Sequence, residues 1–223
     1  MISKPEVTRL KASNLIKGKL KELKGIVVHA TGQSSEDIDE REVKYLSTNS
    51  QFGYHYTIDD DGNIYQYAEH DSLLFHVGAS RLHGYEDLND YTLGVALHAS
   101  EKGAYTEPQI ESLFTLLSWL KQELNIPLGW IVGHKEVSPK RKVDPKYLSM
   151  DEVRSEVDKR IKESQKVKQK EVQIKQRSTD IKQGVTYAMN TLVLYVPNVR
   201  QPIVIDKPYR MQIRGDKIDI NLK

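Results

Sequence analysis

The sequence contains no cysteine among its 223 residues. Disulfide bonds, thiolate metal ligands and a cysteine nucleophile are therefore excluded, so any metal must be held by histidine, aspartate or glutamate. The sequence also lacks an apolar run near the ~20 residues that a helix needs to cross a bilayer, so we predict no membrane span. A formal net charge of +2 is too small to indicate nucleic-acid binding. The remaining composition, 38% hydrophobic and 29% charged, is typical of a globular protein.

The first residues lack the apolar core and the small-residue cleavage site of a secretory signal. We therefore predict synthesis in the cytoplasm without Sec-type export, and release by lysis or another route stays open. Residues 1–24 are rich in lysine, and their leucines are spaced as in a short amphipathic helix with a break near Gly18. We interpret residues 1–24 as an N-terminal extension.

The pattern of residues 25–163 predicts one α/β domain with a mixed central β-sheet flanked by helices. Thr106 and Gln109 form a predicted capping box at the start of the clearest helix. An Asp-Gly turn joins the second and third strands into a hairpin. The predicted strands span residues 25–30, 54–58, 64–67, 91–97 and 130–132, and the predicted helices span residues 34–46, 106–125 and 149–161.

The composition changes twice after this domain. Residues 164–183 are polar and charged, which indicates an exposed helix or a linker. Residues 184–223 are rich in valine, tyrosine and isoleucine, and Gly215 and Asp216 form a two-residue hairpin signal between alternating apolar residues. We predict a charged helical linker followed by a small β-rich appendage, which is near the lower size limit for independent folding.

Two histidines far apart in the sequence are predicted metal ligands. His29 ends a β-branched strand, and His134 opens a proline-punctuated loop that also carries Asp144. Two imidazoles and one carboxylate give Zn²⁺ three ligands and leave a fourth position for water, as in a catalytic rather than a structural zinc site. Taken alone, a histidine at the end of a buried strand is more often a hydrogen-bonded structural residue, and this alternative stays open.

Several short motifs share one order with a known family. This ordered set resembles the zinc-dependent N-acetylmuramoyl-L-alanine amidases of the type 2 class, which include phage T7-type lysozyme and share their fold with peptidoglycan recognition proteins. The resemblance covers residues 25–147. The matching segments are residues 27–31 (VVHAT), 53–56 (GYHY), 61–65 (DGNIY), 75–80 (FHVGAS), 89–97 and 133–145.

The resemblance implies hydrolysis of the amide between N-acetylmuramic acid and the L-alanine of the peptidoglycan stem, with Zn²⁺ as cofactor. It assigns Lys142 to stabilisation of the oxyanion and Tyr54 to orienting the water or donating to the oxyanion. It assigns His76 to the substrate groove, as a substrate-binding residue. The competing interpretations are a solvated Lys142, a Tyr54 that merely fills space and a structural His76. Ala96 stands where bacterial cytosolic relatives have a glutamate, which makes the T7-like branch the better comparison.

Other polar residues receive simpler predictions. His55 alternates with its tyrosine neighbours and is predicted to lie in the core. His70, His83 and His98 have no motif around them, so surface or loop positions are expected. Glu136 is a candidate hydrogen-bond partner for the metal site, although a plainly solvated carboxylate fits its charged surroundings better.

A second function class stays open beside the amidase. A peptidoglycan-binding module of the recognition-protein type needs no intact set of zinc ligands, and digestion of muropeptides distinguishes the two. The expected ligands in either case are peptidoglycan or muropeptides, met after lysis, after other release or in the cytosol. The basic residues 154–182 and the appendage could also dock a wall polymer or a protein partner, or could form only a solvated helix and a stabilising flap.

Overall fold

The computed structural model describes residues 2–31, 51–98 and 105–181, followed by strand residues 187–189, 192–194, 203–205, 209–214 and 217–222. The predicted helix at residues 34–46 lies outside the described residues. The chain divides into two compact units, Met1–Ser164 and Gln165–Lys223. All the candidate site residues lie in the first unit.

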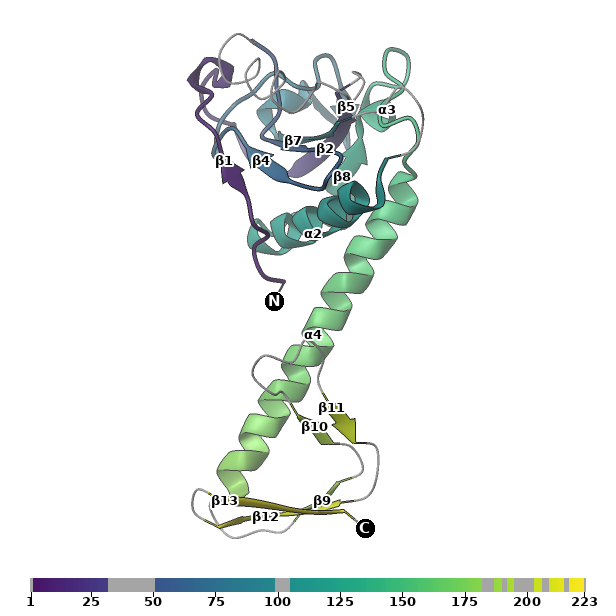
Figure 1. Cartoon of the computed structure of the whole chain (residues 1–223). Coiled ribbons are helices and arrows are strands. Elements are labelled where there is room, and N and C mark those ends of the chain that lie inside the picture. Colours follow the sequence, from purple (N-terminus) through teal and green to yellow (C-terminus); the bar gives the residue numbers. More distant parts are fainter. Residues whose placement is uncertain are drawn as a thin grey trace. The chain divides into compact units, whose positions relative to one another are not determined.

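A six-stranded mixed sheet forms the centre of the first unit, with the order β1-β4-β3-β7-β2-β8 (Figure 1). The pairs β2–β7, β2–β8 and β3–β7 are parallel, whereas β3 and β4 form the predicted antiparallel hairpin. The predicted mixed sheet is therefore confirmed. The strands are β1 (Thr8–Arg9), β2 (Gly25–Ala30), β3 (Tyr56–Ile58), β4 (Ile64–Gln66), β7 (Thr92–Leu97) and β8 (Ile131–Gly133).

Side chains alternate between the two faces of this sheet, because successive residues of a strand point in opposite directions. In β2, Ile26 and Val28 belong to the main core together with residues of the two long helices, whereas Val27 packs in a separate cluster on the other face. His29 follows Val27 by two residues and therefore shares that second face. The candidate site thus lies on the face opposite the long helices.

The helices α2 (Glu107–Glu123) and α4 (Met150–Ile181) supply the covering apolar residues on the first face. The predicted capping box of α2 is present, because Thr106 Oγ1 accepts from Gln109 N and Gln109 Oε1 accepts from Thr106 N. A bidentate pair between Arg160 and Glu111 links the two helices. Burial of each large aliphatic side chain here contributes about 1.5–3 kcal/mol to stability.

Short elements complete the first unit and carry its loops. The tight turn at Gly62 has φ 83°, a conformation that glycine adopts without strain. The short elements of the first unit are η1 (Ser13–Leu15), β5 (Arg81–Leu82), β6 (Tyr85–Glu86), η3 (Leu88–Asp90), η4 (Leu128–Trp130) and α3 (His134–Val137).

The predicted N-terminal helix is wrong. Up to residue 24 the described chain contains the two-residue strand β1, which pairs with β4, the 3-10 turn η1 and an isolated bridge between Lys19 and Ser72, but no α-helix. Leu15 and Ala12 are buried against residues around Tyr67 and Leu74, so the apolar residues are anchors for an extended segment rather than one stripe of a helix. The sequence pattern permitted a helix, but pairing with the open edge of β4 satisfies the backbone instead.

The second unit contains the predicted β-rich residues. The strands β12 and β13 pair antiparallel and connect Arg214 to Lys217 across the predicted hairpin position, whose two connecting residues lie outside the described ones. The division into residues 164–183 and 184–223 stays a prediction. No helix among the described residues is long and apolar enough to span a membrane. The strands here are β9 (Tyr187–Met189), β10 (Leu192–Leu194), β11 (Ile203–Ile205), β12 (Tyr209–Arg214) and β13 (Lys217–Leu222).

The histidines without a motif occupy different environments. His83 is exposed and His70 is half-buried in a loop, as predicted. His98 lies in the loop directly after β7, as predicted, but it is not at the surface, because its exposed fraction is 1%. It follows β7 directly, its N–H donates to Ile58 O, and its carbonyl accepts from Gln109 Nε2. These bonds hold His98 between the sheet and α2.

Because His55 is buried, we predict that the stability of the folded protein depends on pH. His55 is fully buried as expected, and burial lowers its pKa to about 4. Between pH 6.5 and 4 the unfolded state binds a proton that the folded state does not, so stability falls as the pH falls through this window. The loss attributable to His55 is on the order of 3 kcal/mol at pH 4. Denaturant unfolding of the metal-free protein at pH 7 and 4.5 measures it, and H55Q, which cannot titrate, should lose less.

Candidate metal centre

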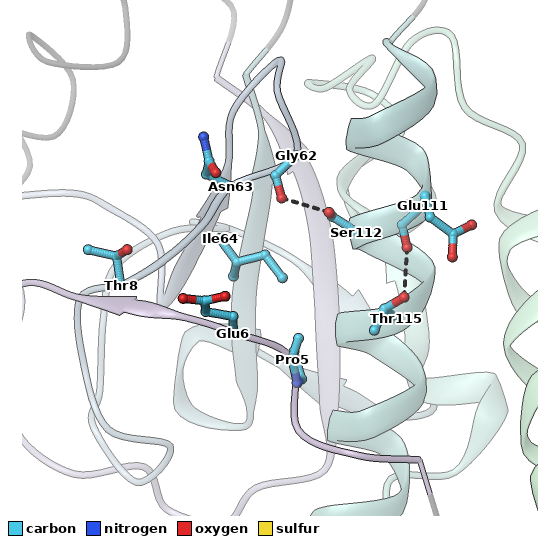
Figure 2. Close-up of a pocket in the computed structure, with 9 residues that line it drawn as sticks. All are labelled: Pro5, Glu6, Thr8, Gly62, Asn63, Ile64, Glu111, Ser112 and Thr115. Atoms are coloured by element: carbon cyan, nitrogen blue, oxygen red, sulfur yellow. Dashed lines mark hydrogen bonds between the residues drawn. The ribbon is translucent and has the colours of Figure 1, made fainter. Parts of the chain in front are cut away.

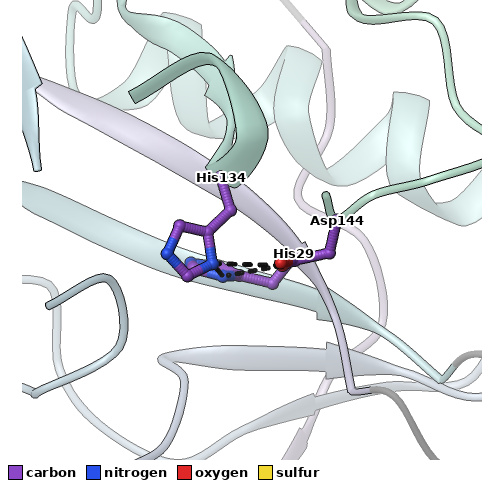
Figure 3. Close-up of side chains that lie close together, drawn as sticks. All are labelled: His29, His134 and Asp144. Atoms are coloured by element: carbon purple, nitrogen blue, oxygen red, sulfur yellow. Dashed lines mark hydrogen bonds and ion pairs between the residues drawn. The ribbon is translucent and has the colours of Figure 1, made fainter. Parts of the chain in front are cut away.

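Three predicted ligands, contributed by distant segments, meet at one point of the first unit (Figure 3). His29 lies near the end of β2, His134 begins α3 directly after β8, and Asp144 follows on the next loop. Their facing atoms are His29 Nδ1 and His134 Nδ1 at 3.0 Å, His134 Nδ1 and Asp144 Oδ2 at 3.1 Å, and His29 Nδ1 and Asp144 Oδ2 at 3.5 Å. The two parallel neighbours β2 and β8 bring the histidines together.

The chemistry of this donor set fits a cation. His134 Nε2 lies 2.9 Å from Val77 O, which can only accept, so a neutral His134 carries its proton on Nε2. Its Nδ1 then turns a lone pair toward an imidazole nitrogen and a carboxylate oxygen. Acceptors that face one another at hydrogen-bond distance repel unless a positive charge lies among them. A metal ion or a proton supplies that charge.

The spacing is compatible with zinc. Ligand atoms at about 2.0–2.2 Å from a tetrahedral Zn²⁺ lie about 3.3–3.6 Å from one another. The observed separations of 3.0, 3.1 and 3.5 Å lie within or slightly below this range. The imidazoles are almost fully buried, with exposed fractions of 1% for His29 and 3% for His134. The Asp144 side chain is 21% exposed, so the site opens to solvent beside the carboxylate. Water can therefore reach the position that the three ligands leave open.

The electrostatics of the site favour metal ligation. Burial lowers the pKa of His29 to about 4, so the ring stays neutral and able to bind a metal at physiological pH. Burial alone would raise the pKa of Asp144, but a positive charge shared with His134 and His29, such as a proton between these groups, outweighs this effect and holds the pKa below its usual value. The carboxylate is therefore charged at physiological pH, as a metal ligand must be.

The two predicted catalytic side chains lie around this centre. The Tyr54 and His29 rings have centroids 5.0 Å apart. Lys142 is half-buried, and its positive charge contributes to the lowered pKa of His29. Within the described ranges no hydrogen bond or ion pair engages the Lys142 ammonium, which leaves it available to a substrate. The roles of both residues stay predictions.

The strand beside His29 presents small residues to the site. Ala96 is the direct neighbour of His29 in the parallel register of β2 and β7, so both side chains point to the same face. A glutamate at this position would lie against the metal ligands, and this chain has only a methyl group there. A general base for this site must therefore come from another residue or from the ligand set itself.

The predicted substrate-binding residue His76 contacts the candidate metal ligand His29. Its Nδ1 lies 3.0 Å from His29 Nε2, and its Nε2 lies 3.1 Å from Thr92 O. Asn89 Oδ1 accepts from the backbone N–H groups of His76 and Val77, which fixes the loop that carries the ring. The substrate-binding role stays a prediction.

The start of α3 is fixed by a charged network. Glu136 accepts from Gly133 N at 2.7 Å and forms two bonds with the Arg154 guanidinium of α4, at 3.2 and 3.1 Å. Glu136 is exposed, as the interpretation of a solvated residue expects, but both of its carboxylate oxygens also have partners in the protein. The sequence could not show this because Arg154 is a distant residue on another helix. The pair holds the turn from which His134 projects.

Lys135 joins the two ligand-bearing segments. Its backbone N–H donates to Asp144 O at 2.7 Å, and its ammonium donates to Pro145 O and Leu148 O, each at 3.0 Å. Because Lys135 follows His134 directly, these three bonds set the separation between the second imidazole and the carboxylate.

We expect K135M to weaken zinc binding about 10-fold, the lower end of the effect of residues that orient metal ligands. The methionine keeps an apolar chain of similar length and loses both bonds of the ammonium. Competition with a chromophoric chelator measures the dissociation constant. K146M removes the same charge from an exposed lysine on the same loop and should leave the affinity unchanged. Equal zinc affinities of K135M and K146M would contradict this role of Lys135 in positioning the two ligands.

A separate hollow of about 380 Å³ lies between the N-terminal segment, the β3–β4 turn and α2 (Figure 2). Ser112 Oγ donates to Gly62 O at one side of it. It is lined by Pro5, Glu6, Thr8, Gly62, Asn63, Ile64, Glu111, Ser112 and Thr115. None of the predicted site residues is among these, so the hollow is not part of the metal centre.

Sequence comparison decides the family. The family described as N-acetylmuramoyl-L-alanine amidase matches residues 19–147, which is more than half of the 223 residues. The chain belongs to this amidase family. The matched residues include all three predicted metal ligands, and membership agrees with the predicted zinc cofactor.

Named relatives agree with this assignment. The chain is 37% identical over 92 residues to the 1,6-anhydro-N-acetylmuramyl-L-alanine amidase AmpD of Haemophilus influenzae, covering 41% of this chain and 50% of that protein. It is 33% identical over 91 residues to AmpD of Escherichia coli, with the same shares of 41% and 50%. The chain thus spans about half the length of these relatives. The preference for the T7-like branch stays a prediction.

Solved structures share the fold. A selenomethionine derivative of AmpD superposes with a TM-score of 0.56 at 22% identity, covering 69% of this chain and 96% of that one. The amidase AmiD of E. coli, in complex with anhydro-N-acetylmuramic acid-L-Ala-D-gamma-Glu-L-Lys, gives a TM-score of 0.52 at 21% identity, covering 63% and 59%. These similarities show that the α/β fold is that of known amidases.

Sequence reasoning missed the residues that act through their backbone or through distant partners. Val77 O and Thr92 O orient the histidines, but any residue offers a carbonyl, so their identities carried no signal. The role of Lys135 could not be predicted for a similar reason, because its partners are all backbone carbonyls. Gly94 did carry a signal, because a glycine within a buried strand often marks a close approach of another group, and a Cβ atom there would lie 2.8 Å from His76 Cγ.

Proposed function

We propose that this protein is a zinc-dependent hydrolase that cleaves the amide bond between N-acetylmuramic acid and L-alanine in peptidoglycan or muropeptides. The observation that carries the proposal is the convergence of His29, His134 and Asp144 in a chain of the amidase family. Such a complete ligand set has no purpose in a module that only binds peptidoglycan. The relatives named AmpD and the AmiD complex support the same substrate class.

The residues of this chain divide the work of the reaction. His29, His134 and Asp144 hold the metal. Zn²⁺ held there would supply a Lewis acid for the activation of water at neutral pH and the polarisation of an amide carbonyl. Lys142 places its ammonium where the negative charge develops on the carbonyl oxygen, which is stabilising in a partly buried site. Tyr54 lies beside His29, where its hydroxyl can orient the attacking water or donate to the same oxyanion.

Digestion of purified muropeptides tests the proposal. Zinc-loaded protein should release the intact stem peptide, with a free L-alanine amino group, and a sugar with a free lactyl carboxylate. Mass spectrometry identifies both products. Treatment with a chelator should stop the release and added Zn²⁺ should restore it. Intact lactyl-alanine bonds after incubation with zinc-loaded protein would instead favour the non-catalytic recognition module.

A docking role for residues 165–223 is proposed as an addition to the enzyme. Two observations support it: these residues form their own compact unit, and the helix that leads into them is rich in lysine. The partner could be an anionic wall polymer or a protein. Removal of residues 182–223 should leave cleavage of soluble muropeptides unchanged and weaken sedimentation with whole walls or capture of the partner. Loss of folding in the shortened chain would show a stabilising flap instead.

The absence of Sec-type export stays a prediction.

A further inference from the structure

His29 uses its two ring nitrogens in two directions. Its Nδ1 faces His134 and Asp144, and its Nε2 lies 3.0 Å from His76 Nδ1. The rings of His29 and His76 are nearly perpendicular, at 85°, so the contact is made edge to edge through these nitrogens and not by stacking. The second imidazole is therefore a hydrogen-bond partner of the metal ligand.

The proton positions follow from the next residue in the chain of bonds. His76 Nε2 lies 3.1 Å from Thr92 O, an atom that can only accept. The Thr92 hydroxyl lies 3.4 Å from the same nitrogen, but it already donates to Leu88 O at 2.6 Å. His76 Nε2 must therefore carry a proton. A neutral His76 then has a lone pair on Nδ1, which accepts from His29 Nε2–H.

This arrangement determines which nitrogen of His29 is free for a metal. With its proton on Nε2, His29 presents the lone pair of Nδ1 to His134 and Asp144. Val77 O does the same for His134, whose Nε2–H it accepts at 2.9 Å. Both histidines are thus held as Nδ1 ligands, one by a carbonyl directly and the other by a carbonyl acting through an imidazole.

Gly94 makes room for the second imidazole. A Cβ atom at this position of β7 would lie 2.8 Å from His76 Cγ and 2.9 Å from its Nδ1. These are atoms near the base of the side chain, so the ring could not avoid them by a small rotation. Asn89 fixes the backbone of His76 from the other side through two N–H bonds. The ring is therefore confined between β7 and its own loop.

We infer that His76 is a positioning residue that holds His29 in the tautomer and orientation required for metal binding, a role different from substrate binding. The inference rests on the proposed function, because it takes His29 to be a zinc ligand. Partners that orient metal-ligating histidines typically change metal affinity by about 10–100-fold when they are removed. A residue that only contacts substrate leaves metal affinity unchanged.

Three variants test the inference in the full chain. H76L removes both ring bonds and should raise the zinc dissociation constant about 10–100-fold. H76N places Oδ1 near the position of Nδ1, retains an acceptor for His29 and should bind zinc more tightly than H76L. G94A keeps His76 but displaces its ring, and it should also weaken zinc binding. H70L, at a half-buried histidine that bonds Tyr56 and not His29, is the matched control and should bind zinc like the wild type.

Two measurements distinguish the possible outcomes for these variants. Chelator competition gives the zinc dissociation constant, and the visible absorption bands of the cobalt-substituted protein report the ligand geometry at His29. Wild-type affinity and wild-type cobalt bands in both H76L and G94A would overturn the inference, as would a raised KM with unchanged zinc affinity in H76L. If H76L does not fold, the comparison of G94A with H70L decides. Failure of the wild type to bind zinc would refute the proposed function instead.

Discussion

Replacement of His134 by alanine should remove bound zinc and lower amidase turnover about 10³-fold. The metal both activates water and polarises the carbonyl, contributions of several kcal/mol, and about 4 kcal/mol corresponds to this factor. His134 Nδ1 is within 3.1 Å of both other ligand atoms, so its loss leaves one imidazole and one carboxylate, which are too few to hold zinc. The same result is expected for His29→Ala, whose ring lies at the same centre.

Two measurements test this effect: the zinc content of the protein by elemental mass spectrometry and the initial rate of muropeptide cleavage. His83 is exposed, and its Nε2 pairs with Gly129 O and not with any of the three candidate ligands. H83A should therefore keep its bound zinc and the wild-type rate. Circular dichroism of each variant separates loss of metal from loss of fold. An H134A protein that is folded, free of zinc and fully active would refute the proposed mechanism.

Replacement of Lys142 by alanine should lower kcat by about 10²–10³ and leave zinc binding intact. This factor is typical for the loss of one donor to an oxyanion. Lys142 is not a metal ligand, and the described part of the structure shows no bond that its ammonium makes to His29, His134 or Asp144. Lys142 lies two residues before Asp144 on the same loop and is half-buried, which is the basis for its proposed role at the oxyanion.

Lys140 provides the matched control, since it is exposed, carries the same charge and lies two residues earlier on the same loop. K140A should therefore keep kcat near the wild-type value. K142R retains a positive charge at a different position and should recover part of the rate. If K142A lost zinc, Lys142 would be a structural support of the metal loop, and equal rates for K142A and K140A would show a solvated lysine.

Local sequence determined most of the elements and the chemical types at the site. The Thr106–Gln109 capping box begins a helix because its partners are three residues apart, and the β3–β4 hairpin follows from its Asp-Gly turn. These interactions close within a few residues, so their pattern is visible in the chain itself. The three candidate metal ligands could likewise be named from the sequence, because the family motifs and the absence of cysteine left few alternatives, and the structure brings them together.

Tertiary structure alone decided how those ligands are held. The extended path of the N-terminal segment depended on the free edge of β4, and the helix pattern of residues 1–24 carried no information about that edge. Lys135, Val77 and Thr92 support the site through backbone carbonyls, which every residue possesses, so their positions cannot be read from residue types. Composition and motif specify which side chains can bind a metal. Long-range packing specifies which of their atoms face it, because that depends on groups brought together only by the folded sheet.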